Sequence, residues 1–118
     1  DGKNFVFLGT DIKIKLDKNH IDLLKDYVDK ELVLGVRPEN IVFTDDKTRT
    51  HLSNGFNMTC DLSELLGHEL IIYNYLSDNR IVVKTTAIDE IKNGEEKEYC
   101  LDLDRIHFFD KETTNRIQ

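Results

Sequence analysis

The second half of the chain is divided into short segments rich in β-branched and aromatic residues, and this pattern limits the folds it can adopt. Segments of this composition, bounded by turn-forming residues, are typical of β-strands. They run over residues 55–62, 70–76, 81–86 and 99–103, with turn signals at Gly67-His68, Ser77-Asp78-Asn79 and Lys92-Asn93-Gly94. A series of short strands with regular turns indicates a β-sandwich or a β-barrel.

The first half adds a hairpin and a helix. Residues 4–9 and 12–16 predict two strands joined by a turn at residues 9–11, because apolar and charged residues alternate over 12–16. From residue 20 the apolar residues recur at helical spacing, which predicts one short helix over about 20–29. We expect Asn19 to be its N-cap and Asp22 to lie in its first turn.

An apolar run at residues 32–34 ends in Gly35, which is followed by Val36 and the triplet Arg37-Pro38-Glu39. Because Pro38 has no N–H and a fixed φ, we expect the strand to end here and Pro38 to start a turn or a short helix. We also expect Arg37 and Glu39 to fix this exit through backbone hydrogen bonds or a charge network. Residues 41–43 continue as a strand, and the polar stretch 44–54 predicts an exposed loop.

Composition and charge exclude several classes of protein. The chain has 118 residues, 39% hydrophobic and 33% charged, which fits one globular domain over 1–118. The net charge of −7 is concentrated in residues 51–118, where seven Lys or Arg face thirteen Asp or Glu. Such a surface repels phosphate backbones and argues against nucleic-acid binding. Cys60 and Cys100 lie in apolar segments, so buried thiols are favoured over a disulfide.

The motifs that would give the chain catalytic chemistry are not found in the sequence. The one Gly-Lys pair, Gly2-Lys3, lacks the upstream glycine and the following Ser or Thr of a phosphate loop. Four histidines and two cysteines are scattered without zinc-ligand spacing. No local signature of a nucleophile is present either. We therefore predict no catalytic, cofactor or metal site in these 118 residues.

Three stretches together resemble one family, the ATP-binding subunits of maltose-type ABC sugar importers. Residues 34–41 resemble its Gly-(Ile/Val)-Arg-Pro-Glu motif, residues 60–67 its Val-x-x-Val-Glu-Pro-Leu-Gly segment, and residues 105–110 its closing Arg-Leu-His-Leu-Phe-Asp. The chain departs from the family pattern at Leu65 and Leu103, where proline is usual, and at Ser63, where an apolar residue is usual.

The resemblance implies a C-terminal regulatory domain of the OB-like barrel type called TOBE: an all-β barrel of short antiparallel strands with one short helix. It implies that an ATP-binding cassette domain, holding ATP and Mg²⁺, precedes this segment, and a start at Asp1 rather than Met fits part of a longer protein. The motif residues that we expect to be structural or to lie at an interface are Gly35, Arg37, Pro38, Glu39, Glu64, Gly67, His107, Phe109 and Asp110.

The resemblance further implies partners and a location. Two regulatory domains would pair in a homodimer, with the segments around Gly67 and His107 as the first candidates for the contact. Permease subunits would be reached through the longer protein at the inner face of the cell membrane, on its cytoplasmic side, and a regulatory protein is a further candidate partner. An alternative is a free-standing barrel that binds a small oxyanion or a sugar. Because OB-like barrels often bind ligands on an open face, we considered Tyr73 and Tyr75 for that role but expect them in the core.

Overall fold

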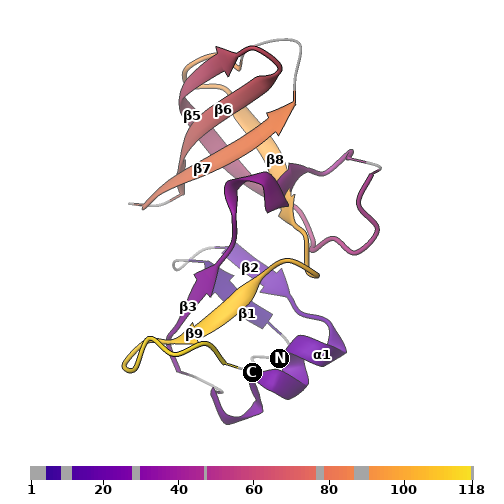
Figure 1. The fold of residues 1–118 in the computed structure, drawn as a ribbon, viewed down its shortest axis with the longest axis vertical. Helices are drawn as coiled ribbons and strands as arrows, with labels where there is room; N and C mark the ends of the chain where they lie inside the picture. Colours follow the sequence, from indigo (N-terminus) through magenta and orange to yellow (C-terminus); the bar gives the residue numbers. More distant parts are fainter. Residues whose placement is uncertain are drawn as a thin grey trace.

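The computed structural model describes residues 5–8, 12–27, 30–46, 48–76, 79–86 and 91–117 of the chain. Strands dominate these ranges, as the sequence predicts (Figure 1). In chain order the elements are β1 (Phe5–Leu8), β2 (Ile12–Lys15), α1 (Lys18–Leu23), the 3-10 helix η1 (Lys25–Tyr27), β3 (Leu32–Gly35), the 3-10 helix η2 (Pro38–Asn40), β4 (Ile41–Phe43), β5 (Phe56–Leu66), β6 (Glu69–Leu76), β7 (Asn79–Thr86), β8 (Glu96–Leu101) and β9 (His107–Asp110).

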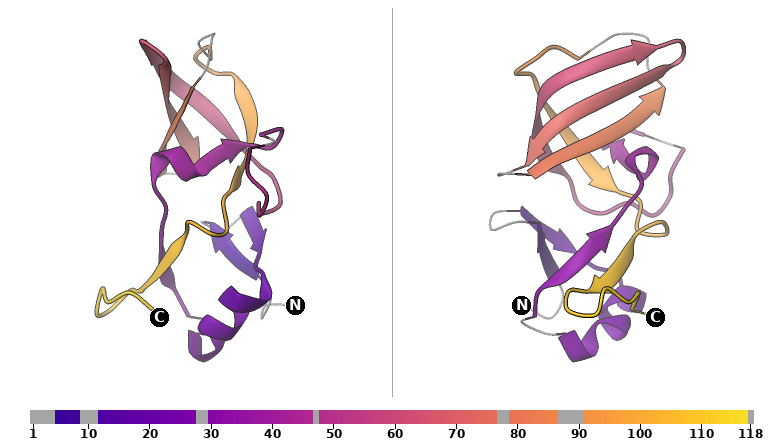
Figure 2. Two further views of the ribbon diagram at one scale, coloured as in Figure 1. Left: turned by 45° about the vertical axis from the view of Figure 1, so that its right-hand side comes forward. Right: turned by 60° about the vertical axis from the view of Figure 1, so that its left-hand side comes forward.

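The largest sheet curls nearly into a barrel, which confirms the predicted all-β, barrel-like fold. Its five strands are ordered β4-β8-β5-β6-β7, and all neighbours are antiparallel. The sheet comes close to closing because β7, at one edge, contacts β4 at the other edge as well as η2. Figure 2 shows β5, β6 and β7 lying side by side across one outer face of this barrel.

Two strand pairs and the helix form the other end of the molecule. β1 pairs with β2, and β3 pairs with β9, each antiparallel, below the barrel in Figure 1. The buried apolar residues of both ends belong to one cluster, which runs from Ile14 and Phe108 to Met58 and Tyr99. The predicted hairpin of the first half is therefore confirmed in its strands, while its turn at 9–11 lies outside the described residues.

The helix differs from its prediction in position and length. α1 spans only Lys18–Leu23 and is capped by Asp17, whose Oδ1 accepts a hydrogen bond from the His20 N–H at 3.2 Å. Asn19 therefore lies inside the helix, and Asp22 lies beyond its first turn, so both capping predictions are wrong. The Asp17 carboxylate accepts a free N–H of the first turn and starts the helix two residues earlier than the sequence indicated.

The two tyrosines of β6 point out of the barrel, whereas the sequence predicted them in its core. Leu70, Ile72 and Asn74 point into the barrel and are fully buried, whereas Tyr73 is half-buried and Tyr75 is 48% exposed. Inside the barrel, Asn74 and the buried Tyr99 hydroxyl lie at hydrogen-bond distance, 3.5 Å. The expectation that Tyr73 and Tyr75 belong to the core is therefore wrong.

The strands of the second half also differ in their limits. β5 continues to Leu66, four residues past its predicted end, with an irregularity in its pairing between Cys60 and Leu62 that leaves Asp61 as a bulge. The two-residue turn to β6 has positive φ at Gly67 alone, 63°, which is the pattern of a type II′ turn. β8 covers 96–101 rather than the predicted 99–103.

Candidate functional site

The Arg-Pro-Glu segment ends β3 and begins the short helix η2, as the sequence predicts. Arg37 has extended backbone angles (φ −76°, ψ 149°), and Pro38 is the first residue of η2. The Asn40 N–H donates to the Arg37 carbonyl at 2.9 Å and closes the turn. Proline suits this position because the first N–H groups of a helix have no partner within it.

The β3–β9 pair presents several motif residues on its outer face. Gly35 lies opposite His107, and Val33 lies opposite Phe109, while Phe108 points inward and is buried. The ring of Phe109 lies over Gly35, so that a Cβ added there would be 2.6 Å from Phe109 Cε2. Glycine at position 35 therefore allows the ring to lie across the neighbouring strand.

Two arginines extend the same face. Val36 packs on the core, so the strand alternation turns the exposed Arg37 outward, beside Gly35 and His107. Arg116 forms a β-bridge with Phe109 on the other side of β9 and is exposed as well. Partial burial, followed by the positive charges of Arg116 and Arg37, lowers the pKa of His107. We call Arg37, His107 and Arg116 the cationic face.

Asp110, the last residue of β9, organises the turn that leads to Arg116. Its Oδ1 accepts the N–H groups of Glu112 (2.9 Å) and Thr113 (3.1 Å), and its Oδ2 accepts the hydroxyl of Tyr27 (3.0 Å). The backbone N–H of Thr113, then the Tyr27 hydroxyl, lower the pKa of Asp110. The role of this motif residue is therefore to hold a turn and to tie it to η1.

Arg49 makes the connections that the sequence led us to expect from Arg37 and Glu39. Its Nη1 donates to Asp102 Oδ2 at 2.7 Å and to Asn40 Oδ1 at 3.0 Å, and its Nη2 donates to the Glu39 carbonyl at 2.9 Å. Within the part of the chain that the structure describes, the side chains of Arg37 and Glu39 form no hydrogen bond or ion pair. Arg49 thereby joins η2 to the segment that follows β8.

A second polar cluster joins α1 to the same segment. His51 Nε2 lies 3.2 Å from Asp17 Oδ2, and His51 Nδ1 lies 2.9 Å from Asp104 Oδ1. The hydrogen bond to Asp104 raises the pKa of His51 against the opposing effect of burial. Burial would raise the pKa of Asp17, but its hydrogen bonds with His20 and the charges of His20 and His51 lower it overall.

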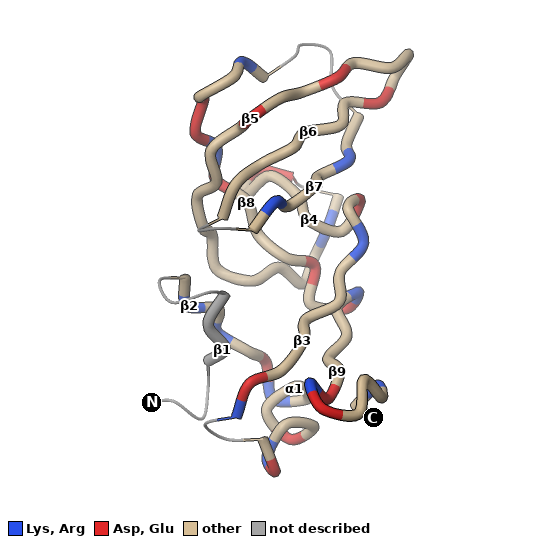
Figure 3. The backbone as a smooth tube through the Cα atoms, turned by 90° about the vertical axis from the view of Figure 1, so that its left-hand side faces the viewer, with Lys and Arg blue, Asp and Glu red and all other residues tan. Residues whose placement is uncertain are grey.

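The remaining motif residues, Glu64 and Gly67, lie at the far end of the barrel. They belong to the β5–β6 hairpin, whose tip lies at the end of the molecule opposite β9 (Figure 3). Next to them, six apolar side chains turn outward from β5, β6 and β7. Leu62, Tyr73 and Val82 pair across the three strands, and the other three pair with charged or polar residues. We call these residues the outer apolar face: Leu62, Leu66, Ile71, Tyr73, Tyr75 and Val82.

Charged residues flank this outer apolar face with opposite signs on its two sides (Figure 3). Asp61 and Glu64 belong to β5, whereas Arg80 and Lys84 belong to β7. The guanidinium of Arg80 lies 4.7 Å from the centre of the Tyr73 ring and 3.4 Å from Asp61 Oδ2. Ion pairs and a cation–π contact thus hold the rim of the face in place.

The described residues contain no clustered metal ligands and no exposed thiol. Among them, no three His, Cys, Asp or Glu side chains are grouped so that they could hold a metal ion. Cys60 and Cys100 are buried thiols without a disulfide, as predicted, and burial raises the pKa of Cys100 to about 11. Thiols of this kind are poor nucleophiles at neutral pH.

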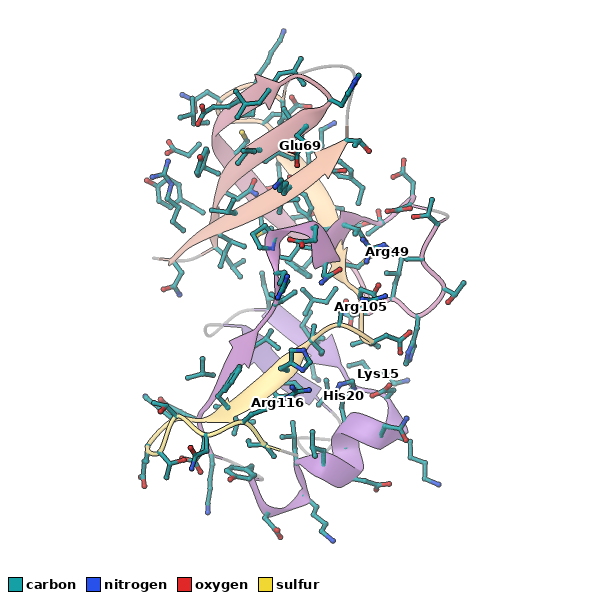
Figure 4. All side chains as sticks on the ribbon, viewed as in Figure 1. Lys15, His20, Arg49, Glu69, Arg105 and Arg116 are labelled. Atoms are coloured by element: carbon teal, nitrogen blue, oxygen red, sulfur yellow. The ribbon has the colours of Figure 1, made fainter. Side chains whose placement is uncertain are left out.

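The structure divides the predicted site residues into two groups. Gly35, Arg37, His107 and Phe109 meet on the β3–β9 face, with Asp110 at the end of β9 and with Pro38 and Glu39 in the short helix that follows β3. Glu64 and Gly67 lie apart from them, in the β5–β6 hairpin. Sequence reasoning missed Arg49, His51 and Arg116, because they lie in loops that show no hydrophobic periodicity. Figure 4 labels Arg49 in the loop after β4 and Arg116 beside β9.

No protein-family model matches the chain. The chain is 31% identical over 94 residues to the oligosaccharides import ATP-binding protein MsmX of Bacillus subtilis, covering 80% of this chain and 26% of that protein. It is 27% identical over 118 residues to the putative uncharacterized ABC transporter ATP-binding protein YcjV of Escherichia coli K12, covering all of this chain and 31% of that protein. It is 30% identical over 94 residues to the multiple sugar-binding transport ATP-binding protein MsmK of Streptococcus mutans, covering 80% of this chain and 25% of that protein.

The chain thus spans between a quarter and a third of the length of these relatives. Within the described residues, no helix is long and apolar enough to cross a membrane.

Proposed function

We propose that this chain, a homologue of part of the ATP-binding subunits of ABC sugar importers, is the regulatory and dimerisation domain of such a subunit. The observation that supports this role is the match over 80% or more of the chain to proteins of this class, three to four times its length. The barrel-like all-β fold agrees with the TOBE or OB-like domain that the motif residues resemble. The chain would then take part in transport through its contacts with other proteins and would not itself catalyse a reaction.

ATP hydrolysis would take place in another part of the longer protein. ATP and Mg²⁺ would be bound by a cassette domain, since the phosphate loop that cradles them is not found in these 118 residues. The longer protein would work with membrane permease subunits at the inner, cytoplasmic face of the membrane, and a regulatory protein could dock on this domain. Calorimetric titration of the chain with Mg-ATP is expected to show no binding, and a micromolar Kd would contradict this division.

The outer apolar face supports the proposed homodimer. Leu62 and Leu66 are 49% and 55% exposed, and Tyr75 nearly as much, on one continuous surface. Exposed apolar patches of this kind are typical of interaction surfaces. This face includes the hairpin at Gly67, which was one of the two segments expected at the contact, whereas His107 lies at the other end of the molecule.

The charges beside this face are compatible with a second copy of the same chain. A two-fold axis parallel to the strands places β5 of one copy over β7 of the other. Glu64 of each copy would then approach Lys84 of its twin, which pairs with Glu69 in its own copy, and the Asp61–Arg80 pairs of the two copies would lie beside each other, while the apolar side chains meet between them. In the longer protein the cassette domains would raise the effective concentration of the two regulatory domains, so a modest contact would suffice.

Sedimentation velocity over a range of concentrations tests the contact. We expect a weak dimer in the wild-type chain and a monomer for Leu66→Ser and Tyr75→Ser. Val33→Ser is the matched control because Val33 is equally exposed, but on β3. If Val33→Ser weakened the dimer and Leu66→Ser did not, the contact would lie outside the outer apolar face.

A domain exchange tests the function itself. The chain replaces the homologous region of MsmX, and uptake of oligosaccharides by cells that depend on MsmX is measured. We expect uptake to be retained with the exchanged domain and lost when the region is deleted. A fusion protein that hydrolyses ATP and does not support uptake would argue against an importer role for this domain.

A further inference from the structure

The cationic face stands out because the chain as a whole carries a net charge of −7. Three side chains that carry or accept a positive charge lie on one side of a small sheet, with His107 on the central strand β9, Arg37 beyond the end of β3, and Arg116 bridged to the opposite edge of β9. All three are exposed to solvent. Backbone pairing fixes the positions of His107 and Arg116 on β9 and its bridge, and Arg37 follows two residues after the paired Gly35.

Among the residues that the structure describes, no carboxylate pairs with these three side chains. Of the acidic residues near β3 and β9, Asp110 accepts from Tyr27 and from its own turn, Glu31 pairs with Lys111, and the exposed Glu39, two residues after Arg37, forms no ion pair with it. The titratable group that approaches from α1 is His20, another potential cation, whose ring meets the buried Phe108 edge-on at 5.8 Å. The charges around His107 therefore have one sign, and partial burial together with Arg116 and Arg37 lowers its pKa.

Like charges that gather without a partner destabilise a fold unless a counter-ion joins them. An anion placed between Arg37 and Arg116, above His107, would receive donors from three directions. The guanidinium fork suits an acceptor with several oxygens, such as phosphate, better than a single carboxylate oxygen. Phe109 and Gly35 supply a flat, apolar floor beneath this position, where the imidazole is partly shielded from water.

We propose that Arg37, His107 and Arg116 form a binding site for a tetrahedral oxyanion of the phosphate type. The site is separate from the outer apolar face and does not depend on the proposed importer role. An oxyanion is also one of the two ligands named for the alternative function, a free-standing barrel that binds a small oxyanion or a sugar. The same chemistry could come from free phosphate or from a phosphoryl group on a side chain, and both contain the three acceptor oxygens that the site requires.

A titration of the isotope-labelled chain with sodium phosphate, followed by NMR at constant ionic strength, tests the site. We expect saturable shifts at the amides of Gly35, His107 and Arg116, with a Kd on the order of 1 mM, and a rise in the pKa of His107 on binding. A second titration with O-phosphoserine distinguishes the sources: tighter binding than that of phosphate assigns the site to a phosphorylated side chain, and equal or weaker binding assigns it to the free ion.

Variants with the same change in charge separate a site from general electrostatics. Arg37→Gln and Arg116→Gln should each weaken phosphate binding about tenfold, the order expected for one lost charge-assisted hydrogen bond. Lys92→Gln removes one positive charge from an exposed turn of the barrel and should leave the Kd unchanged. Shifts that rise linearly without saturation, or an equal loss of affinity in Lys92→Gln, would overturn the proposal. Unchanged amide spectra outside β3 and β9 exclude misfolding of the variants.

Discussion

Replacing Arg49 with alanine should destabilise the chain more than any other single change to an exposed or half-exposed charge. The side chain donates to Asp102, Asn40 and the Glu39 carbonyl, and thus joins three separate segments. Its partner Asp102 is almost buried, with 9% of the side chain exposed. Removing Arg49 leaves that carboxylate in a poorly solvated place without its counter-charge.

The magnitude lies between two limits. Breaking a fully buried ion pair by removing one partner costs about 3–5 kcal/mol, and an exposed pair contributes about 0.2–1 kcal/mol. The Arg49 side chain is 27% exposed, so water replaces part of its hydrogen bonding. We therefore expect Arg49→Ala to lose about 2 kcal/mol of unfolding free energy, which lowers the urea midpoint by about 1 M for the slope usual in small proteins.

Arg37→Ala is the matched control for this measurement. The structure gives the Arg37 side chain no polar partner among the described residues, so its replacement should change the unfolding free energy by about 0.5 kcal/mol or less. Arg49→Lys keeps the charge but loses the planar fork, and it should recover only part of the loss. Equal midpoints for Arg49→Ala and Arg37→Ala would refute the assignment of this role to Arg49.

Three further predictions concern single residues. Asp104 raises the pKa of His51, so the ion pairs of His51 should stabilise the fold fully below about pH 6.5 and lose that effect as pH rises through the folded-state pKa. The difference in urea midpoint between wild type and His51→Gln should therefore shrink towards alkaline pH. Gly35→Ala should lower the unfolding free energy by about 1–3 kcal/mol because the new Cβ overpacks against Phe109. In urea titrations, the double variant of Gly35→Ala with Phe109→Leu should lose less stability than the two single variants lose together. Gly67→Ala meets no neighbour within 4 Å, so thermal unfolding should report only the cost of its positive φ, about 1–2 kcal/mol.

Local chemistry made part of this fold predictable. Pro38 and Gly35 mark the end of β3 because their backbone limits act over one or two residues. The alternation over residues 12–16 predicted the strand β2 because its period of two is also local. The start of α1 was misplaced because Asp17 and Asn19 are both good caps. The contact of Asp17 with His51, more than thirty residues away, is a tertiary preference that local sequence does not contain.

Sequence motifs supplied some residues of the β3–β9 face but not Arg116, and they did not predict how these residues come together. Gly35 and His107 were chosen from separate motifs, and only the pairing of β3 with β9 shows that they face each other. Arg49 and Arg116 have no signature in sequence, since an arginine in a polar loop is usually a solvated side chain. Their roles follow from the fold: Arg49 meets Asp102, which is distant in sequence, and Arg116 bridges back to Phe109 after the turn that Asp110 holds.

Strand β6 shows why one error in the prediction also carries information about function. Alternation identifies the buried face of a strand only when the other face is polar. In β6 both faces are largely apolar, with Leu70 and Ile72 on one side and Ile71, Tyr73 and Tyr75 on the other, so the pattern could be read in either direction. The barrel resolves the ambiguity by burying the face that carries an asparagine, not the face with two tyrosines. The apolar, aromatic side that β6 leaves exposed is the surface on which the proposed homodimer contact depends.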